Sequence, residues 1–206
     1  MNAKLFLVSP AAVLALALAP ALTSSPEASA PAPTRSSFVV DGGHSSVVFW
    51  ARHMGVADFY GTFNAISGEV VENASDPSES SVNITIQAAS VDSRDEGRDA
   101  HLTSPDFFSA EEFPQIVFES TAVEAGDEEG SYEVTGELTV RGVTKTVTTT
   151  VTKTGEADTR MGPKAGFKCE FTFDMEEFRF PAMARMDESA LGRTAQVIVS
   201  LECNKR

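Results

Sequence analysis

The chain has 206 residues, of which 42% are hydrophobic, so it is long enough to form one domain with a sizeable core. Its formal net charge is −14. This acidity argues against binding to nucleic acid or to an anionic membrane surface, because both require a basic face that neutralises phosphates.

The first residues have the pattern of a secretory signal peptide. Lys4 supplies a positive charge, and residues 5–18 form an apolar run too short to span a bilayer. Cleavage after Ala21 or after Ala30 fits the small-residue pattern. We predict export to the periplasm or the extracellular space, with no transmembrane segment in the mature chain. We assign residues 1–30 to the signal peptide and the start of a tether rich in Pro, Ala and Ser, 31–37 to the rest of that tether, and 38–206 to the folded domain.

From residue 38 onward the apolar residues recur with period two, which predicts strands with one face toward a core. Gly61 and Gly68 indicate bulges or sharp curvature in the second strand. In the first strand, Val47, Phe49 and His53 share the inward face. The eight predicted strands are residues 46–53, 59–71, 82–88, 115–120, 132–140, 144–154, 167–173 and 195–203.

A short helical insertion is predicted where the strand pattern stops, between residues 90 and 121. Asp99 precedes an apolar run, as a helix N-cap does, and Pro105 limits the segment 99–110 to one or two turns. We expect the apolar residues of this insertion to cap one end of the folded domain against the first strands. These residues are Leu102, Phe107, Phe108 and Phe113.

Eight antiparallel strands with one helical insertion predict an all-β fold that closes into a barrel, because closure removes exposed strand edges. A two-sheet sandwich is the alternative. A barrel of about eight strands is wide enough to be filled by side chains or to hold one small ligand. Many Phe residues fall on inward faces beside small residues such as Ala51 and Gly136. This pattern fits an apolar cavity, and it also fits a packed core.

Short motifs recur in order along residues 40–202, among them His53-Met54-Gly55, Gly61-Thr62-Phe63, Arg98-Asp99, His101-Leu102, Asp106-Phe107-Phe108 and the run GELTVRGVTK at residues 136–145. Through these motifs the region resembles the YceI-like family of polyisoprenoid-binding proteins. The resemblance implies an eight-stranded antiparallel, lipocalin-like barrel with a helix near its mouth. It also implies export and a long apolar tunnel for an isoprenoid or a related amphiphile.

Residues 175–193 depart from the family pattern, which usually has an Arg-containing loop followed by a Phe-Gly-rich turn. Met, Phe and Pro dominate this segment instead. Its role is left open. Met183 and Met186 can form an adaptable apolar lip, or they can be ordinary loop anchors.

Polar residues near the insertion are candidates for binding a ligand head group. Arg98 and His101, together with Asp99, can contact a phosphate or a hydroxyl; alternatively they form a helix cap and a salt bridge that fix the insertion. His53 either meets the head group or is a buried, hydrogen-bonded histidine. His44 and His53 lie at opposite ends and on opposite faces of one strand, so they cannot share a metal ion. We predict no metal and no cofactor.

No enzyme motif is present, since the sequence has no Gly-x-Ser-x-Gly elbow and no phosphate-binding Gly-rich loop. We predict an exported, non-enzymatic protein that holds a polyisoprenoid or similar long-chain amphiphile. The alternatives are an envelope stress or structural protein without an obligatory ligand, and an enzyme acting on a bound lipid. The oligomeric state is not predicted. The residues expected to contact the ligand are Val47, Phe49, His53, Phe63, Ile84, Ile86, Arg98, His101, Phe107, Phe108, Phe118, Leu138, Phe167, Phe171 and Phe173.

The two cysteines, Cys169 and Cys203, fall on the last two predicted strands. An oxidising compartment would let a disulfide persist between them. Such a bridge would stabilise the fold by on the order of 3 kcal/mol in the loop-entropy model. The alternative is that both are small core residues with free thiols.

Overall fold

The computed structural model describes residues 35–187 and 189–206; the predicted signal peptide, its cleavage sites and residues 31–34 of the tether lie outside this part. β1 begins at Arg35, before the predicted end of the tether at residue 37. The elements are β1 (Arg35–Val40), β2 (Ser46–His53), β3 (Ala57–Phe63), β4 (Ile66–Asn73), η1 (Pro77–Glu79), β5 (Ser81–Gln87), η2 (Ala88–Ser90), β6 (Val91–Asp92), α1 (Glu96–Thr103), β7 (Gln115–Ala125), β8 (Ser131–Val140), β9 (Val143–Thr159), β10 (Gly162–Asp174), α2 (Pro181–Arg185) and β11 (Leu191–Lys205).

One antiparallel sheet closes on itself to form the barrel. β11 pairs with β10 along one edge and with both β2 and β1, one after the other, along its other edge. β1 and β2 therefore act as a single long strand with a short interruption. In the same way, β3 and β4 together form the next strand of the ring, and β5 and β6 together form the strand after it. The ring then has eight strands, which confirms the predicted barrel and excludes the sandwich.

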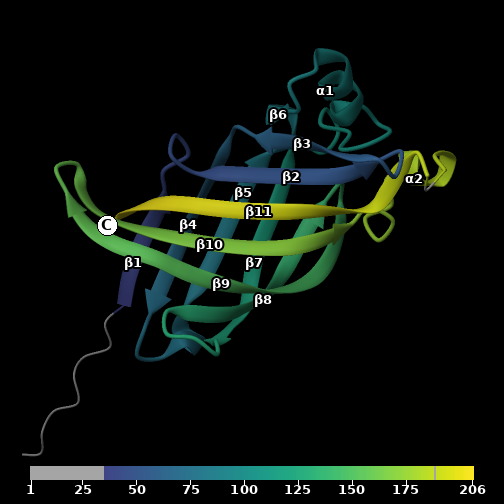
Figure 1. Cartoon of the computed structure of the whole chain (residues 1–206). Helices are drawn as coiled ribbons and strands as arrows, with labels where there is room; N and C mark the ends of the chain where they lie inside the picture. The colour runs from purple at the N-terminus through teal and green to yellow at the C-terminus, as the bar shows by residue number, and fades with distance from the viewer. Residues whose placement is uncertain (1–34, 188) are drawn as a thin grey trace, which may run out of the picture. The chain divides into compact units, whose positions relative to one another are not determined.

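The two ends of the barrel differ. In Figure 1, α2 and the chain's C-terminus lie at opposite ends of β11, and α1 lies beside β3 and β6. The α2 end is covered by helical segments, because Ala182 N–H donates to the Asp106 carbonyl (3.0 Å) and the Phe107 and Phe180 rings are 6.1 Å apart. The helical insertion therefore caps one end of the barrel, and the segment containing α2 covers the same end.

Alternation of side chains decides which residues face the interior. In β8, Val134, Leu138 and Val140 are buried, whereas Thr135, Glu137 and Thr139 on the other face are only half-buried. In β9, alternate threonines such as Thr148 and Thr150 face solvent. Burial of the alternate apolar residues stabilises the barrel, at about 1.5–3 kcal/mol for each large apolar side chain that leaves water.

Gly61 and Gly68 are not bulges, because the strand pairing runs through both without a shift in register. A Cβ atom at Gly61 would lie 2.4 Å from Cζ of Phe49. A Cβ atom at Gly68 would lie 2.2 Å from the carbonyl oxygen of Asn83. Both glycines are therefore required for space, one under an aromatic ring and one against a neighbouring backbone.

The helix of the insertion begins earlier than predicted. α1 starts at Glu96, and its N-cap is Asp95, whose side chain accepts a hydrogen bond from the Arg98 amide at 2.8 Å. The prediction that Asp99 caps the helix was wrong, because Asp95 lies at the N-cap position and Asp99 is already inside the first turns. Among the described residues, no helix is long and apolar enough to cross a membrane.

Candidate functional site

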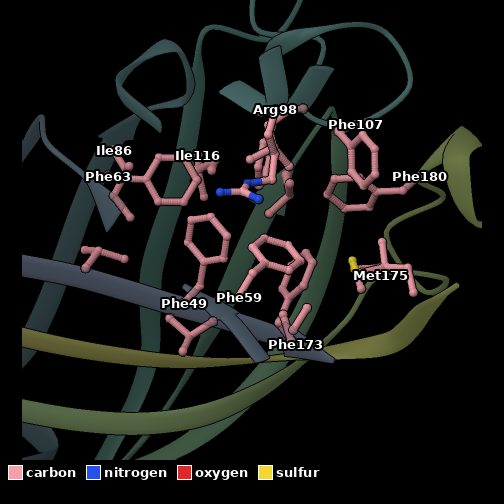
Figure 2. Close-up of a pocket in the computed structure, with 18 of the residues that line it drawn as sticks. Phe49, Phe59, Phe63, Ile86, Arg98, Phe107, Ile116, Phe173, Met175 and Phe180 are labelled. Carbon is pink, nitrogen blue, oxygen red and sulfur yellow. The ribbon is translucent and has the colours of Figure 1, made fainter. Parts of the chain in front are cut away.

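An apolar cavity occupies the barrel interior at the α1 and α2 end; we call it the outer chamber. Its volume is about 240 Å³. Aromatic rings from β2, β3 and β10 form its walls, and Phe107 and Phe180 close it from the covering segments. Figure 2 shows these rings converging on one space, with the Arg98 side chain reaching in among them.

A second, smaller cavity, the inner chamber, continues toward the other end of the barrel. Its volume is about 100 Å³, and its walls include Ile84, Phe118 and Phe167. The two chambers share Ile86, Leu138, Phe171 and Val199 as walls, so only side chains separate them. The interior is therefore a row of apolar spaces that narrows away from the helices.

A polar network closes the narrow end, and we call it the floor. Glu72 is 6% exposed and accepts hydrogen bonds from Tyr132 Oη (2.8 Å) and from Lys153 Nζ (2.7 Å). Burial, reinforced by the bond to Glu72, raises the pKa of Tyr132 to about 12. A buried carboxylate is stable here because both of its oxygens are paired. The floor lies beside Phe167, which is also a wall of the inner chamber.

Arg98 lies at the opposite, wide end, where it is held in a fixed orientation. Its Nε donates to Ser93 Oγ (2.8 Å), and one terminal nitrogen donates to the Ser93 carbonyl (2.6 Å). Asp99 accepts from both the amide and the hydroxyl of Ser93. The guanidinium lies 5.1 Å from the centroid of the Phe59 ring, a cation–π distance. In the described part of the chain, no carboxylate forms an ion pair with Arg98. The helix cap and the charged contact of the alternative involve other pairs of the insertion, since Asp95 caps α1 and His101 lies 3.4 Å from Asp106.

The two histidines of the outer chamber are at its mouth. His53 is exposed at the end of β2 and still lines the chamber, so the alternative of a buried histidine is wrong. His101 Nε2 lies 3.4 Å from Asp106 Oδ2, and its ring packs edge-on against Phe107 with centroids 4.9 Å apart. Arg185 also pairs with Asp106, and this bond and the contact with His101 lower the pKa of that carboxyl.

The segment 175–193 forms the roof of the outer chamber. Phe180 is 2% exposed, and its ring lies 5.3 Å from that of Phe108 and 5.7 Å from that of Phe173. Arg141, in the turn between β8 and β9, donates to the carbonyls of Arg179 (3.1 Å) and Pro105 (3.2 Å). Arg141 therefore connects the roof to the α1 insertion by hydrogen bonds to both.

The structure brings together every residue that the sequence predicted for the ligand site. Val47, Phe49, His53, Phe63, Arg98, His101, Phe107, Phe108 and Phe173 line the outer chamber; Ile84, Phe118 and Phe167 line the inner one; Ile86, Leu138 and Phe171 line both. Whether they contact a ligand remains a prediction. The sequence did not indicate Met175 and Phe180, because the segment that carries them has no regular period. Met186 is a wall of the chamber, whereas Met183 is buried outside it as an anchor.

The predicted disulfide is absent, and both cysteines are free thiols. Cys169 lies opposite Val199, and Cys203 lies opposite Ala165. The two cysteines are thus offset by four residues along the ladder, or about 13 Å at ~3.3 Å per residue. A bridge requires Cα atoms within about 7 Å, so the register forbids it. Cys169 instead lines the inner chamber, and burial raises the pKa of each thiol to about 11.

One group of potential metal ligands, Asp41, His44 and Glu202, lies together outside the two chambers. Lys164 Nζ is 3.3 Å from Asp41 and 2.7 Å from Glu202. Because an ammonium group already pairs with both carboxylates, this cluster is explained as an ion-pair network that joins β10 and β11 to the loop after β1.

Comparisons with known proteins agree with this architecture. A family model described as the YceI-like domain matches residues 38–203. A UPF0312 protein of Photorhabdus laumondii is 33% identical over 164 residues, covering 79% of this chain and 82% of that protein. Protein YceI of Escherichia coli O157:H7 is 32% identical over 163 residues, covering 79% of this chain and 82% of the relative.

Solved structures give the same result. The crystal structure of BcnA from Burkholderia cenocepacia superposes with a TM-score of 0.72 at 25% identity, over 79% of this chain and 98% of that one. A polyisoprenoid-binding domain from Saccharophagus degradans has the same fold, with a TM-score of 0.62 at 12% identity, over 85% of this chain and 100% of the domain. The family match spans nearly all of the barrel. The chain therefore belongs to the YceI-like family.

Proposed function

We propose that this chain is an exported binding protein that holds a polyisoprenoid or a similar long-chain amphiphile inside its barrel. One observation carries the proposal: a row of apolar chambers that is wide and polar-rimmed at one end and closed at the other. An apolar chain needs only apolar walls, while its head group needs a few placed polar partners.

The rim supplies such a partner in Arg98. Its guanidinium is oriented by Ser93 and has no carboxylate to neutralise it among the described residues. Charge-assisted hydrogen bonds from arginine are strong and suit phosphate or carboxylate oxygens. In this proposal the ligand head group contacts Arg98 and His101, and the apolar tail of the ligand runs past Leu138 toward Phe167.

Two further features support the proposal. A Saccharophagus domain of the same fold is described as polyisoprenoid-binding, which makes a long isoprenoid the first ligand to test. The N-terminal sequence has the charge and apolar run of a signal peptide, which supports export. Periplasmic or extracellular location and a non-enzymatic role are parts of this proposal.

Native mass spectrometry of the protein purified from its host tests the proposal directly. We expect a long-chain lipid to be retained by the folded protein and to be returned unchanged after organic extraction. Turnover of that lipid would instead indicate an enzyme, and a folded barrel without any exchangeable lipid would indicate a structural protein; either result would reject the proposal.

Variants locate the ligand. Ile84→Asp and Phe171→Asp place a charge in the chambers, so each is expected to abolish lipid retention. Ile86→Trp fills the boundary between the chambers without a charge and is expected to reduce retention. Thr150→Asp, on the exposed face of β9, is the matched control and should retain lipid normally. Full retention in both folded proteins, Ile84→Asp and Phe171→Asp, would show that the ligand does not lie in the barrel, because Phe171 lines both chambers.

A further inference from the structure

Exposed apolar side chains are concentrated on one hairpin. Among the described residues, four large hydrophobic side chains are strongly exposed, and three of them lie on the β2–β3 hairpin: Met54 (59%), Val56 (79%) and Tyr60 (48%). Tyr60 also stacks on Trp50 of β2, with ring centroids 5.8 Å apart. An apolar patch of this kind on a folded protein commonly marks an interaction site.

The turn at the tip of this hairpin holds its apolar residue at a conformational cost. The Val56 amide donates to the His53 carbonyl (3.0 Å), and Met54 and Gly55 have φ values of 54° and 67°. Two-residue turns with positive φ at both positions favour Asn-Gly, and a bulky side chain there is disfavoured. A solvent-exposed methionine at this position therefore neither favours the turn conformation nor adds to the buried core.

The same hairpin forms part of the mouth of the outer chamber. His53 and Phe59 flank the tip and line the chamber, while Trp50 and Tyr60 lie on the other face of the two strands. An amphiphile that leaves the chamber past His53 would therefore emerge beside Met54 and Val56.

We propose that the tip Met54-Gly55-Val56 inserts into a neutral lipid surface, with Trp50 and Tyr60 at the level of the head groups. The proposal rests on the proposed function, because it provides the route by which a membrane-derived amphiphile reaches the mouth. Tyr and Trp are suited to this level, since their rings are apolar and carry a polar group. The net charge of −14 argues against electrostatic attraction to an anionic surface. Arg52 and Asp58, which flank the tip on β2 and β3, form an ion pair at 2.9 Å and so neutralise each other.

The size of the patch also favours lipid over a protein partner. These three exposed side chains present on the order of a few hundred Å², whereas a stable protein interface buries about 800 Å² on each partner. Insertion into lipid has no such area requirement, because each apolar group that leaves water contributes by itself.

Flotation with phosphatidylcholine vesicles tests the proposal, using the full mature chain after removal of bound lipid. The wild-type protein is expected to float with the vesicles. Trp50 is the only tryptophan in the chain, so brominated phosphatidylcholine should quench its fluorescence when the hairpin docks. No flotation with neutral vesicles, or flotation only when phosphatidylglycerol is added, would overturn the proposal.

The decisive variant is Met54→Asn combined with Val56→Ser. Asn is favoured in this turn, so the variant should fold at least as well as the wild type. It is expected to lose vesicle binding by about tenfold or more. Met161→Ser is the matched control, since Met161 is 77% exposed in the β9–β10 turn, and it should bind as the wild type does. Equal binding by all three proteins would refute the insertion of the tip.

Two more measurements separate this proposal from its alternatives. Dimerisation of the wild type that the Met54→Asn, Val56→Ser variant abolishes would overturn it in favour of a contact between copies. The Ile84→Asp variant is expected to dock normally, because its substitution lies inside the barrel. Docking that persists when no lipid is ever retained would support the membrane contact and reject only the proposed cargo.

Discussion

Gly61→Ala should shrink the outer chamber by moving one aromatic ring. The added Cβ would lie 2.4 Å from Cζ of Phe49, and ordinary contacts begin near 3.4 Å, so the ring must move by about 1 Å. Phe59 and Phe63 flank the Phe49 ring with centroids at 6.5 and 5.6 Å. The ring therefore cannot slide along the strand, and the space open to it is the chamber.

The expected effect on stability is small, and the effect on binding is larger. Overpacking costs about 1–3 kcal/mol, and we expect the lower limit because the ring enters unfilled space. A displaced ring and an added methyl remove room for one or two methylene groups of a ligand. At about 0.8 kcal/mol per methylene, binding should weaken by roughly 4- to 15-fold.

Fluorescence titration of the delipidated protein with a fluorescent prenyl probe measures this change, and urea unfolding measures the stability. Gly155→Ala is the control, since a Cβ there meets nothing within 4 Å. In a Phe49→Leu background the Gly61→Ala change should have almost no further effect, because the clashing ring atom is gone. Binding within twofold of the wild type for Gly61→Ala would refute the argument that the Phe49 ring borders the ligand.

Other consequences can be checked independently. Thiol titration of the exported protein, unfolded without reductant, should find two free thiols, from Cys169 and Cys203; a result of none would show that the register is wrong. Phe180→Ala should lower the free energy of unfolding by about 3 kcal/mol, seen as a melting temperature lower by roughly 6–12 °C, because it removes the centre of the roof. The exposed neighbour Glu177→Ala should change it by less than about 0.5 kcal/mol, and equal effects would contradict the role of Phe180. Bonds from Lys205 and Lys153 lower the pKa of Glu156 from 4.5 to about 2, so its stabilising contribution is present above pH 4.5 and is lost as the pH falls toward 2. Acid titrations of unfolding should show a weaker loss over that range in Glu156→Gln, and an unchanged pH profile would contradict the assignment.

The local sequence pattern was sufficient to predict which residues form the inner walls of the barrel. Period-two alternation placed Val47, Phe49, Ile84, Phe171 and their equivalents on one face of each strand, and a closed sheet turns all such faces toward one interior. The same pattern does not distinguish a filled core from a cavity. It depends on how far the rings reach across the barrel, which is a property of the packed structure.

Other features depend on contacts that local sequence does not encode. The floor joins Glu72 to Tyr132 and Lys153, which are 60 and 81 residues away along the chain. Phe180 lies in a segment without a period, and its place in the roof depends on rings and carbonyls contributed by the α1 insertion and β10.

Register and helix phase are the clearest examples of what tertiary structure decides. The sequence determined that Cys169 and Cys203 lie on neighbouring strands, but only the pairing showed them offset by four residues. The sequence also determined that a capped helix lies near residue 99, but in the structure the N-cap is Asp95 and not Asp99. In each case several arrangements satisfy the local pattern almost equally. Long-range packing selects one of them, because only one arrangement buries the alternate faces of all eight strands at once.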